Sequence, residues 1–154
     1  MSGINKKTLV SVASKEGLIE FARALKDLHF EIIATGGTHK LLGENSIEAI
    51  KISDYTGGSE SERVKTLSQR IAKEILETGE IGLVVCNLYP FFAQKDKSLE
   101  EMVELIDIGG VTLIRAAAKN YKKVCVVFDP SQYQEVIDAL KQDRMDETFR
   151  LELA

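Results

Sequence analysis

The chain has 154 residues, of which 44% are hydrophobic and 29% are charged, and this size and composition are typical of one globular domain with its own core. Its formal charge of −4 argues against nucleic acid or an anionic membrane surface as the main partner, because both require a basic face. No stretch has the length and apolarity of a signal peptide or a membrane span, and Cys86 and Cys125 lie in apolar runs, which predicts buried reduced thiols in a cytoplasmic protein.

Strand and helix patterns alternate along the chain. Apolar runs at residues 8–13, 31–35, 81–87 and 123–128 predict strands covered on both faces, and residues 46–52 are a weaker candidate. Helical spacing follows the first strand over residues 16–28, a capping box marks a helix start at Ser98, and an aspartate-proline pair marks another at Asp129. Residues 53–62 are predicted to form a loop. The alternation predicts an α/β fold with a mostly parallel sheet between helical layers.

The first two strands lead into candidate anion-binding turns. The motif TGGT at residues 35–38 joins a strand to a helical pattern, which suits a phosphate held by backbone N–H groups, although a tight turn that needs glycine explains it equally well. Ser11, Ser14 and Lys15 follow the first strand and are placed to reach the same anion. Capping by Ser14 beside a solvated Lys15 explains these residues without any ligand.

Two later segments carry polar side chains near a predicted strand end. Arg63 and Lys65 are two residues apart and point to one side of an extended chain, with Thr66 placed to begin the next helix; a solvated basic pair is the simpler interpretation. Asn87 closes a buried run, where a polar side chain needs partners. Tyr89 follows it, and a tyrosine at this place more often packs than reacts.

The segment IDIGGVTLIRAAAKN places Asp107 and two glycines before an apolar helix pattern that is predicted to be buried nearly all round. A carboxylate at this place caps the helix and is stabilised by its N-terminus. Lys119 lies about 15 Å further along the same helix, so it meets Asp107 only through a bend or across a subunit interface. His29 and His39 have no acidic or thiol partner at metal-ligand spacing, and no metal site is predicted.

Taken in order, several blocks resemble the inosine monophosphate cyclohydrolase family: LVSVASKEGLIEFARAL, ATGGTHKLL, SDYTG, RVKTL, NLYPF, IDIGGVTLIRAAAKN and VVFDPSQY. The blocks RVKTL, NLYPF and IDIGG with RAAAKN are specific to that family, whereas TGG is shared with methylglyoxal-synthase-like domains. The resemblance implies a Rossmann-like, methylglyoxal-synthase-like three-layer fold, with residues 1–154 as a single domain. It also implies a hydrolase of cyclic amidines that runs in the ring-closing direction and converts 5-formamidoimidazole-4-carboxamide ribonucleotide to inosine monophosphate, with no cofactor.

Carried over position by position, the resemblance assigns ring closure to Lys65, Tyr89, Asp107 and Lys119. Asp107 would assist removal of the carboxamide proton, Lys65 or Tyr89 would stabilise the departing oxygen, and Lys119 would tune the charge of the set. The positions expected around the nucleotide are Ser11, Ser14, Lys15, Thr35, Gly36, Gly37, Thr38, Arg63, Thr66, Asn87, Ile108, Gly109 and Gly110.

The chain departs from the family pattern after the lysine-threonine pair. It reads SQRIAKEIL, a helical pattern over residues 66–76, where the family has a histidine-proline and a glycine-bearing turn. The loop before Arg63 is shorter, and Ala13-Ser14 replaces the usual serine-aspartate. The transformylase domain of the family is absent, which fits a compact monofunctional version as well as a truncated piece.

The resemblance further implies a purine ribonucleotide as ligand, a homodimer, and a separate AICAR transformylase that supplies the substrate, without nucleic acid or a membrane as partner. Two other functions fit part of the pattern. A non-catalytic phosphate-sensing module, of the kind appended to carbamoyl phosphate synthetase, needs the glycine turn but not Asp107. Methylglyoxal synthase needs an aspartate and a histidine near the phosphate turn, for which His39 alone is weak support.

Overall fold

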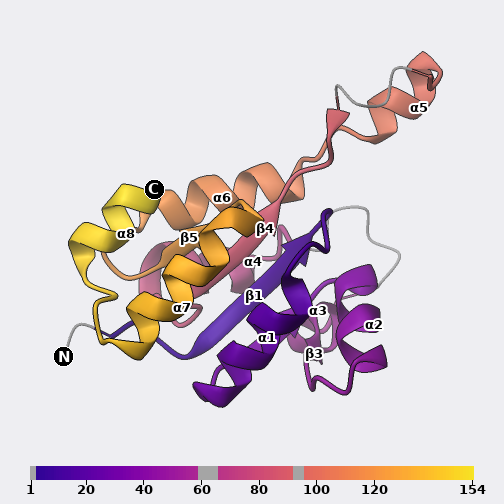
Figure 1. The fold of residues 1–154 in the computed structure, drawn as a ribbon. Helices are drawn as coiled ribbons and strands as arrows, with labels where there is room; N and C mark the ends of the chain where they lie inside the picture. Colours follow the sequence, from indigo (N-terminus) through magenta and orange to yellow (C-terminus); the bar gives the residue numbers. More distant parts are fainter. Residues whose placement is uncertain (1–2, 59–65, 92–95) are drawn as a thin grey trace.

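Five strands form one parallel sheet in the computed structural model, which describes residues 3–58, 66–91 and 96–154 (Figure 1). The strands are β1 (Lys7–Val12), β2 (Glu31–Ala34), β3 (Ile50–Lys51), β4 (Leu83–Asn87) and β5 (Cys125–Val127). They lie in the order β3-β2-β1-β4-β5, and every neighbouring pair is parallel. The predicted α/β fold with a parallel sheet is confirmed, and the weak strand at residues 46–52 is present as two residues.

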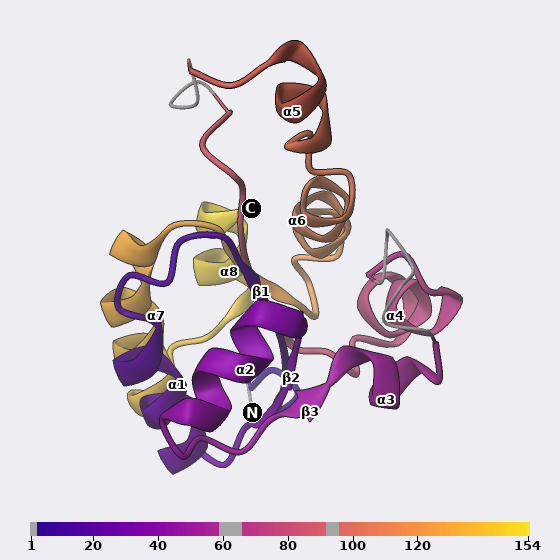
Figure 2. The same cartoon turned by 90° about the vertical axis from the view of Figure 1, so that its right-hand side faces the viewer.

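Helices cover both faces of this sheet, as Figures 1 and 2 show from two sides. One layer contains α1 (Leu18–Asp27), α2 (Gly36–Glu44), α7 (Tyr133–Lys141) and α8 (Glu147–Leu153), and a 3-10 turn, η3 (Pro130–Gln132), leads into α7. The other contains α3 (Ile52–Thr56), α4 (Gln69–Lys73), its π-helical continuation η1 (Glu74–Thr78) and α6 (Gly109–Lys119). A further helix, α5 (Leu99–Glu104), projects away from the sheet in both views.

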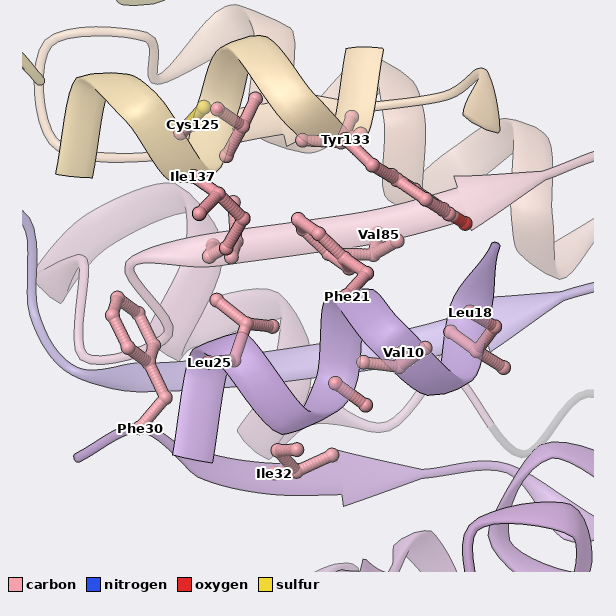
Figure 3. Packing of buried hydrophobic residues seen from close by; sticks show 14 of the residues in the cluster. Val10, Leu18, Phe21, Leu25, Phe30, Ile32, Val85, Cys125, Tyr133 and Ile137 are labelled. Carbon is pink, nitrogen blue, oxygen red and sulfur yellow. The ribbon is translucent and has the colours of Figure 1, made fainter. Parts of the chain in front are cut away.

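Two hydrophobic cores lie between these layers, because successive residues of a strand point to opposite faces. Leu9 and Val10 of β1 accordingly belong to different cores. In the core drawn in Figure 3, Phe21 of α1 stacks on Tyr133 of α7 with ring centroids 4.2 Å apart. Amphipathic helices on both sides therefore keep the sheet dry, as the continuous apolar strand patterns predict.

Both cysteines lie in this interior. Cys86 and Cys125 are free and buried, as predicted, and burial raises the pKa of each thiol to about 12. A thiol with so high a pKa is a poor nucleophile at neutral pH. Among the described residues, no helix is long and apolar enough to cross a membrane.

Two predicted helix boundaries are wrong. The loop predicted over residues 53–62 begins as helix α3, because Ile52 and Tyr55 lie three residues apart and both enter the core. Thr66 does not begin the next helix: the hydroxyl of Ser68 accepts a hydrogen bond from the backbone N–H of Ile71 (3.1 Å) and caps α4. Serine is a favoured residue at the N-cap position of a helix. Thr66 lies two residues before this cap and is not part of the helix.

Two further predictions about helices fail for reasons of packing. Ser14 does not cap α1, which begins after Gly17 in the left-handed conformation (φ 64°) without a side-chain cap. Helix α6 is not buried all round, since only one face, which includes Leu113 and Ala117, enters the core. Val111 and Arg115 are exposed on α6 because no other described element covers that side.

The chain order of the strands creates a switch point in the middle of the sheet. From β1 the chain builds outward to β2 and β3, then crosses to β4 on the other side of β1 and continues to β5. Helices that leave β1 and β4 therefore depart in different directions, and a crevice opens at the carboxyl ends of these two strands. Ser11 near the end of β1 is paired with Cys86 near the end of β4, which places both strand ends at this crevice.

Candidate functional site

An open cavity of about 480 Å³ lies at the switch point. Its walls come from five parts of the chain: Ser11 in β1, Thr35 after β2, Thr66 before α4, Tyr89 after β4 and the segment that leads into α6. The predicted residues that line it are Ser11, Thr35, Thr66, Tyr89, Asp107, Ile108, Gly109 and Gly110. Residues more than 90 positions apart in the sequence therefore meet around one cavity of a size that suits a small molecule.

The glycine turn opens helix α2 beside this cavity. Thr35 is the residue before the helix, and its hydroxyl donates to the hydroxyl of Ser11 (3.1 Å). A Cβ atom built at Gly36 or at Gly37 would meet no atom within 4 Å, so the backbone of the first helical turn borders open space. The N-terminus of a helix with accessible N–H groups favours an anion.

A lysine lies behind this turn. The ammonium group of Lys15 donates to the hydroxyl of Thr38 (3.0 Å) and to the carbonyl oxygen of Val12. Burial lowers the pKa of Lys15. The side chain of Lys15 is exposed, as the simpler sequence interpretation holds, but its ammonium group is hydrogen-bonded to both turns.

Asn87 holds the loop between β1 and α1. Its side-chain oxygen accepts from the backbone N–H groups of Ala13 (2.6 Å) and Ser14 (2.8 Å), and its side-chain nitrogen donates to the carbonyl oxygen of Ser14 (3.1 Å). The sequence predicted that this buried amide needs partners, and the loop supplies them. All these contacts are internal, so Asn87 shapes the loop rather than reaching into the cavity.

Asp107 lies where the cavity meets the N-terminus of α6. One carboxylate oxygen accepts from the N–H of Gly110 (2.7 Å), so the predicted capping role is confirmed. A Cβ atom at residue 110 would lie 2.7 Å from the other carboxylate oxygen, which explains the glycine. Cys86 packs beneath, with its thiol 3.6 Å from the carbonyl oxygen of Gly110. One side of the carboxylate is thus held by the helix while the residue lines the cavity.

The remaining wall comes from residues that the sequence did not indicate. Val103, Glu104, Leu105 and Ile106, at and after the end of α5, line the cavity. Val103 and Ile106 are more than half exposed, as is Tyr89 opposite them. The only sequence signal for this wall was the presence of large apolar side chains near polar site residues. In the sequence, these side chains belong to an ordinary amphipathic helix pattern, so they did not stand out.

Lys15, Gly36, Gly37, Thr38 and Asn87 are not part of the cavity wall, and four further predicted positions lie elsewhere or outside the described part. Ser14 borders a second depression next to Gly17 rather than the cavity itself. Lys119 is exposed in the last turn of α6, which runs without interruption from Gly109, so the two ends of the helix stay about 15 Å apart. Arg63 and Lys65 lie outside the described residues.

Metal binding has no geometric basis in the described part of the chain. There, no three His, Cys, Asp or Glu side chains converge as ligands. His29 is exposed just after α1, and the ring of His39 contacts the carbonyl oxygen of Ala49 (3.1 Å).

Comparisons with known proteins agree with this architecture. Residues 17–112 match the MGS-like domain family, and residues 117–154 match the family described as AICARFT/IMPCHase bienzyme. A solved structure described as the crystal structure of ForH superposes with a TM-score of 0.83 at 28% sequence identity, over 97% of this chain and 87% of that one.

Two curated relatives carry the name bifunctional purine biosynthesis protein PurH. The protein from Thermoanaerobacter sp. is 46% identical over 89% of this chain and 31% of its own length, and that from Staphylococcus aureus is 42% identical over 96% of this chain and 34% of its own length. The chain thus spans about a third of the length of these relatives. The alignments run over 157 and 168 residues, more than the 154 of this chain, so the relatives carry residues that this chain lacks.

Proposed function

The chain belongs to the family of MGS-like domains, and we propose that it is an inosine monophosphate cyclohydrolase that closes the purine ring of 5-formamidoimidazole-4-carboxamide ribonucleotide. The observation that carries the proposal is the cavity at the switch point, which joins an anion-binding helix turn to the carboxylate of Asp107. The match of residues 117–154 to a family described as AICARFT/IMPCHase supports the same reaction.

The substrate's phosphate would bind at the N-terminus of α2. A Cβ atom at Gly36 or Gly37 would meet no atom within 4 Å, so a ligand has room beside this turn, and the ammonium group of Lys15 donates to the hydroxyl of Thr38 in the same turn. Thr35 and Ser11 offer hydroxyl groups on the cavity wall. This end of the cavity recognises the ribonucleotide and leaves the imidazole ring to extend toward Asp107 and Tyr89.

Ring closure then needs two protons to leave nitrogen and two to reach the departing oxygen. The carboxamide nitrogen forms a bond to the formyl carbon and gives up one proton to Asp107, while the formyl oxygen takes up a proton and becomes a hydroxyl group. The formamido nitrogen then loses its proton as its double bond to that carbon forms, and the hydroxyl group takes up the second proton and leaves as water. Tyr89 lines the same cavity and would stabilise that oxygen, together with Lys65. Holding the two substituents in contact supplies a further part of the rate enhancement.

The direct test is incubation of the protein with the formamido ribonucleotide, because ring closure changes the ultraviolet absorbance. We expect inosine monophosphate to form, and the Lys65→Ala variant to form it much more slowly. Tight binding of the nucleotide without turnover would support a phosphate-sensing module instead. Methylglyoxal formed from dihydroxyacetone phosphate would support methylglyoxal synthase.

We further propose that the protein works in the cytoplasm as a homodimer, alongside a separate AICAR transformylase. The support for the dimer is the α5 segment, which projects from the body (Figure 2) and has no buried residue. Leu99, Ile106 and Ile108 on and after α5 are between 56% and 73% exposed. A second copy that covers these side chains would remove much apolar surface from water.

The homodimer predicts a mass in solution near twice 17.1 kDa by light scattering. Replacing Leu99 by glutamate should shift the protein toward monomer, because it places a charge in the apolar contact. The matched control is Leu151→Glu on α8, where the leucine is 54% exposed but lies away from α5, and it should leave the dimer intact. A wild-type monomer at micromolar concentration would contradict this arrangement.

A further inference from the structure

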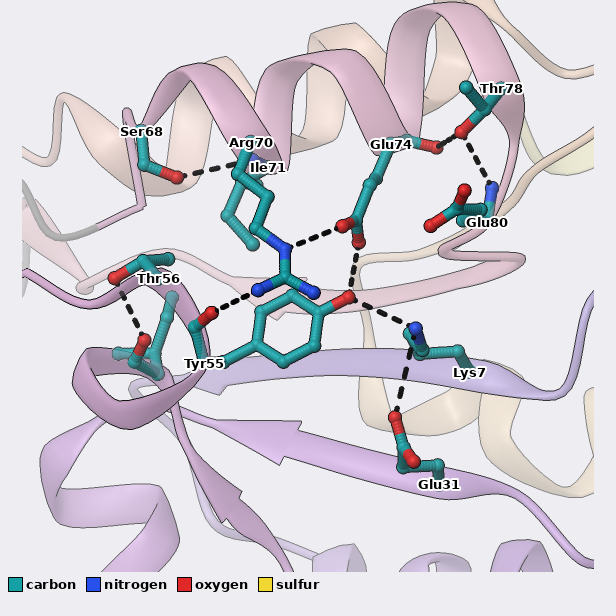
Figure 4. Close-up of polar contacts among 11 residues, drawn as sticks. Lys7, Glu31, Tyr55, Thr56, Ser68, Arg70, Ile71, Glu74, Thr78 and Glu80 are labelled. Carbon is teal, nitrogen blue, oxygen red and sulfur yellow. Dashed lines mark hydrogen bonds and ion pairs between the residues drawn. The ribbon is translucent and has the colours of Figure 1, made fainter.

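A cluster of polar side chains ties helix α4 to the rest of the fold at a distance from the cavity. We define the Tyr55 cluster as Lys7 from β1, Tyr55 from α3, and Arg70 and Glu74 from α4 and η1 (Figure 4). Glu74 is only 5% exposed, and its two carboxylate oxygens are taken by the Tyr55 hydroxyl and by Nε of Arg70 (2.8 Å). A buried carboxylate needs such partners, which makes the cluster a specific arrangement rather than a solvated set of charges.

Tyr55 is the centre of the cluster. Its hydroxyl donates to Glu74 and accepts from the ammonium group of Lys7 (3.0 Å), and its carbonyl oxygen accepts from Arg70. The guanidinium carbon of Arg70 lies 3.9 Å from the centroid of the Tyr55 ring, a cation–π contact. Burial raises the pKa of Tyr55, and the hydrogen bond with Tyr55 raises the pKa of Lys7, so both groups keep their protons at neutral pH. The donor directions of the cluster are therefore fixed.

The cluster controls the placement of α4, and α4 leads directly to the cavity. Ile71 and Ile75 bury the apolar face of α4 and η1, but apolar contacts alone permit a helix to slide or rotate. Tyr55 accepts a hydrogen bond from Arg70 and donates one to Glu74, and these two bonds fix both the rotation of α4 and its position along the axis. Ser68, two residues before Arg70, caps the helix, and Thr66 lies two residues earlier on the cavity wall.

The far end of the same element is held separately. The side-chain amide of Asn120, at the end of α6, donates to the carbonyl oxygen of Ile75 (2.6 Å), and Lys123 donates to that of Glu77 (2.9 Å). These contacts anchor η1, where the π-helical turn displaces the usual backbone hydrogen bonds. The Tyr55 cluster therefore holds the N-terminal half of the element, the end that is nearer to Thr66 in sequence.

We propose that Tyr55, Arg70 and Glu74 are positioning residues for the reaction, which set Thr66 in the substrate cavity by fixing α4 against α3 and β1. The inference rests on the proposed function, because it concerns the binding of the same ribonucleotide. None of the three residues lines the cavity, so their effect on the substrate passes through α4 and Thr66. A position that contributes equally to substrate and transition-state binding is expected to alter KM more than kcat.

The test compares Glu74→Gln and Tyr55→Phe with Glu77→Gln as the matched control. Glu77 lies on the same π-helical turn with an exposed side chain, so its substitution changes the same functional group without touching the cluster. We expect each cluster variant to raise KM for the formamido ribonucleotide about tenfold at 25 °C, with kcat changed less than about twofold. The KM of the double variant should be no higher than that of the more impaired single variant, because the two residues act as a unit.

Hydrogen exchange provides a readout that does not depend on turnover. The backbone N–H groups of Ile71 and Ala72 bond to the side chain and the carbonyl of Ser68, so they report on the first turn of α4. We expect both to exchange about tenfold faster in Glu74→Gln and unchanged in Glu77→Gln. If the wild type makes no inosine monophosphate, the proposed function is wrong. The exchange rates of these two amides still show whether the Tyr55 cluster fixes α4.

Two results would overturn the proposal. One is a lower melting temperature of the cluster variants with KM unchanged, which would make the cluster a purely structural contact. The other is unchanged exchange of the two reporter amides in Glu74→Gln. If Glu74→Gln does not fold, Tyr55→Phe takes its place, because it removes a single hydroxyl and keeps the ring that Arg70 covers.

Discussion

Replacing Gly82 by alanine is expected to lower the free energy of unfolding by about 3 kcal/mol or more, one of the largest effects of a single methyl group in this fold. A Cβ atom at this position would lie 2.2 Å from the carbonyl oxygen and 2.6 Å from the nitrogen of Asn5, both backbone atoms. Gly82 cannot move away from Asn5, because its N–H donates to the carbonyl oxygen of Lys7 (2.9 Å) and its carbonyl oxygen accepts from the backbone N–H of Cys125 (2.9 Å). The clash therefore sits where β1, β4 and β5 begin.

The measurement is the midpoint of urea unfolding, followed by circular dichroism, with Gly43→Ala as the matched control. Gly43 lies in α2, where an added Cβ meets no atom within 4 Å, so alanine should stabilise that helix by about 0.5–1 kcal/mol. The same substitution thus has opposite expected signs at two sites. Equal midpoints for Gly82→Ala and the wild type would show that the contact with Asn5 is not rigid.

The fold follows from the sequence where local pattern and packing agree. Apolar runs that alternate with helical patterns predict the strands of a parallel sheet, and Ser98 with Glu101 forms the capping box that its spacing predicts. The prediction failed where a tertiary contact overrides a local preference. Residues 53–56 are rich in turn formers, but Tyr55 becomes helical because its ring is buried beneath Arg70 and its hydroxyl is bound by Glu74.

The site was predictable only as a set of residue types at strand ends. Parallel strands bring Ser11, Thr35 and Tyr89 to one edge, and a cavity there follows from topology. The sequence does not predict whether a polar residue faces the cavity or the interior, because Asn87 and Thr35 both come at the end of a strand. Asn87 binds its own loop while Thr35 borders the cavity, and the difference depends on the path of residues 13 and 14.

Replacing Asp107 by asparagine is expected to slow ring closure by about 10²–10⁴-fold, the usual contribution of a general base, with little change in stability. The asparagine side-chain oxygen can still accept from the N–H of Gly110, so the cap on α6 and the shape of the wall are kept. What is lost is the ability to take the carboxamide proton. The prediction therefore separates the capping role of this residue from its proposed role in chemistry.

Asp146→Asn is the matched control for this variant. Asp146 caps α8 through a hydrogen bond from Phe149 (2.9 Å), with the same three-residue spacing as Asp107 and Gly110, but it lies outside the cavity. Both variants lose one negative charge at a helix N-terminus, so any shared change in melting temperature reports on capping alone. Only Asp107→Asn should lose kcat, measured by the absorbance of the product. If Asp107→Asn kept more than about a tenth of the wild-type kcat, the loss would be smaller than a general base contributes, and the proton would have to go to another group.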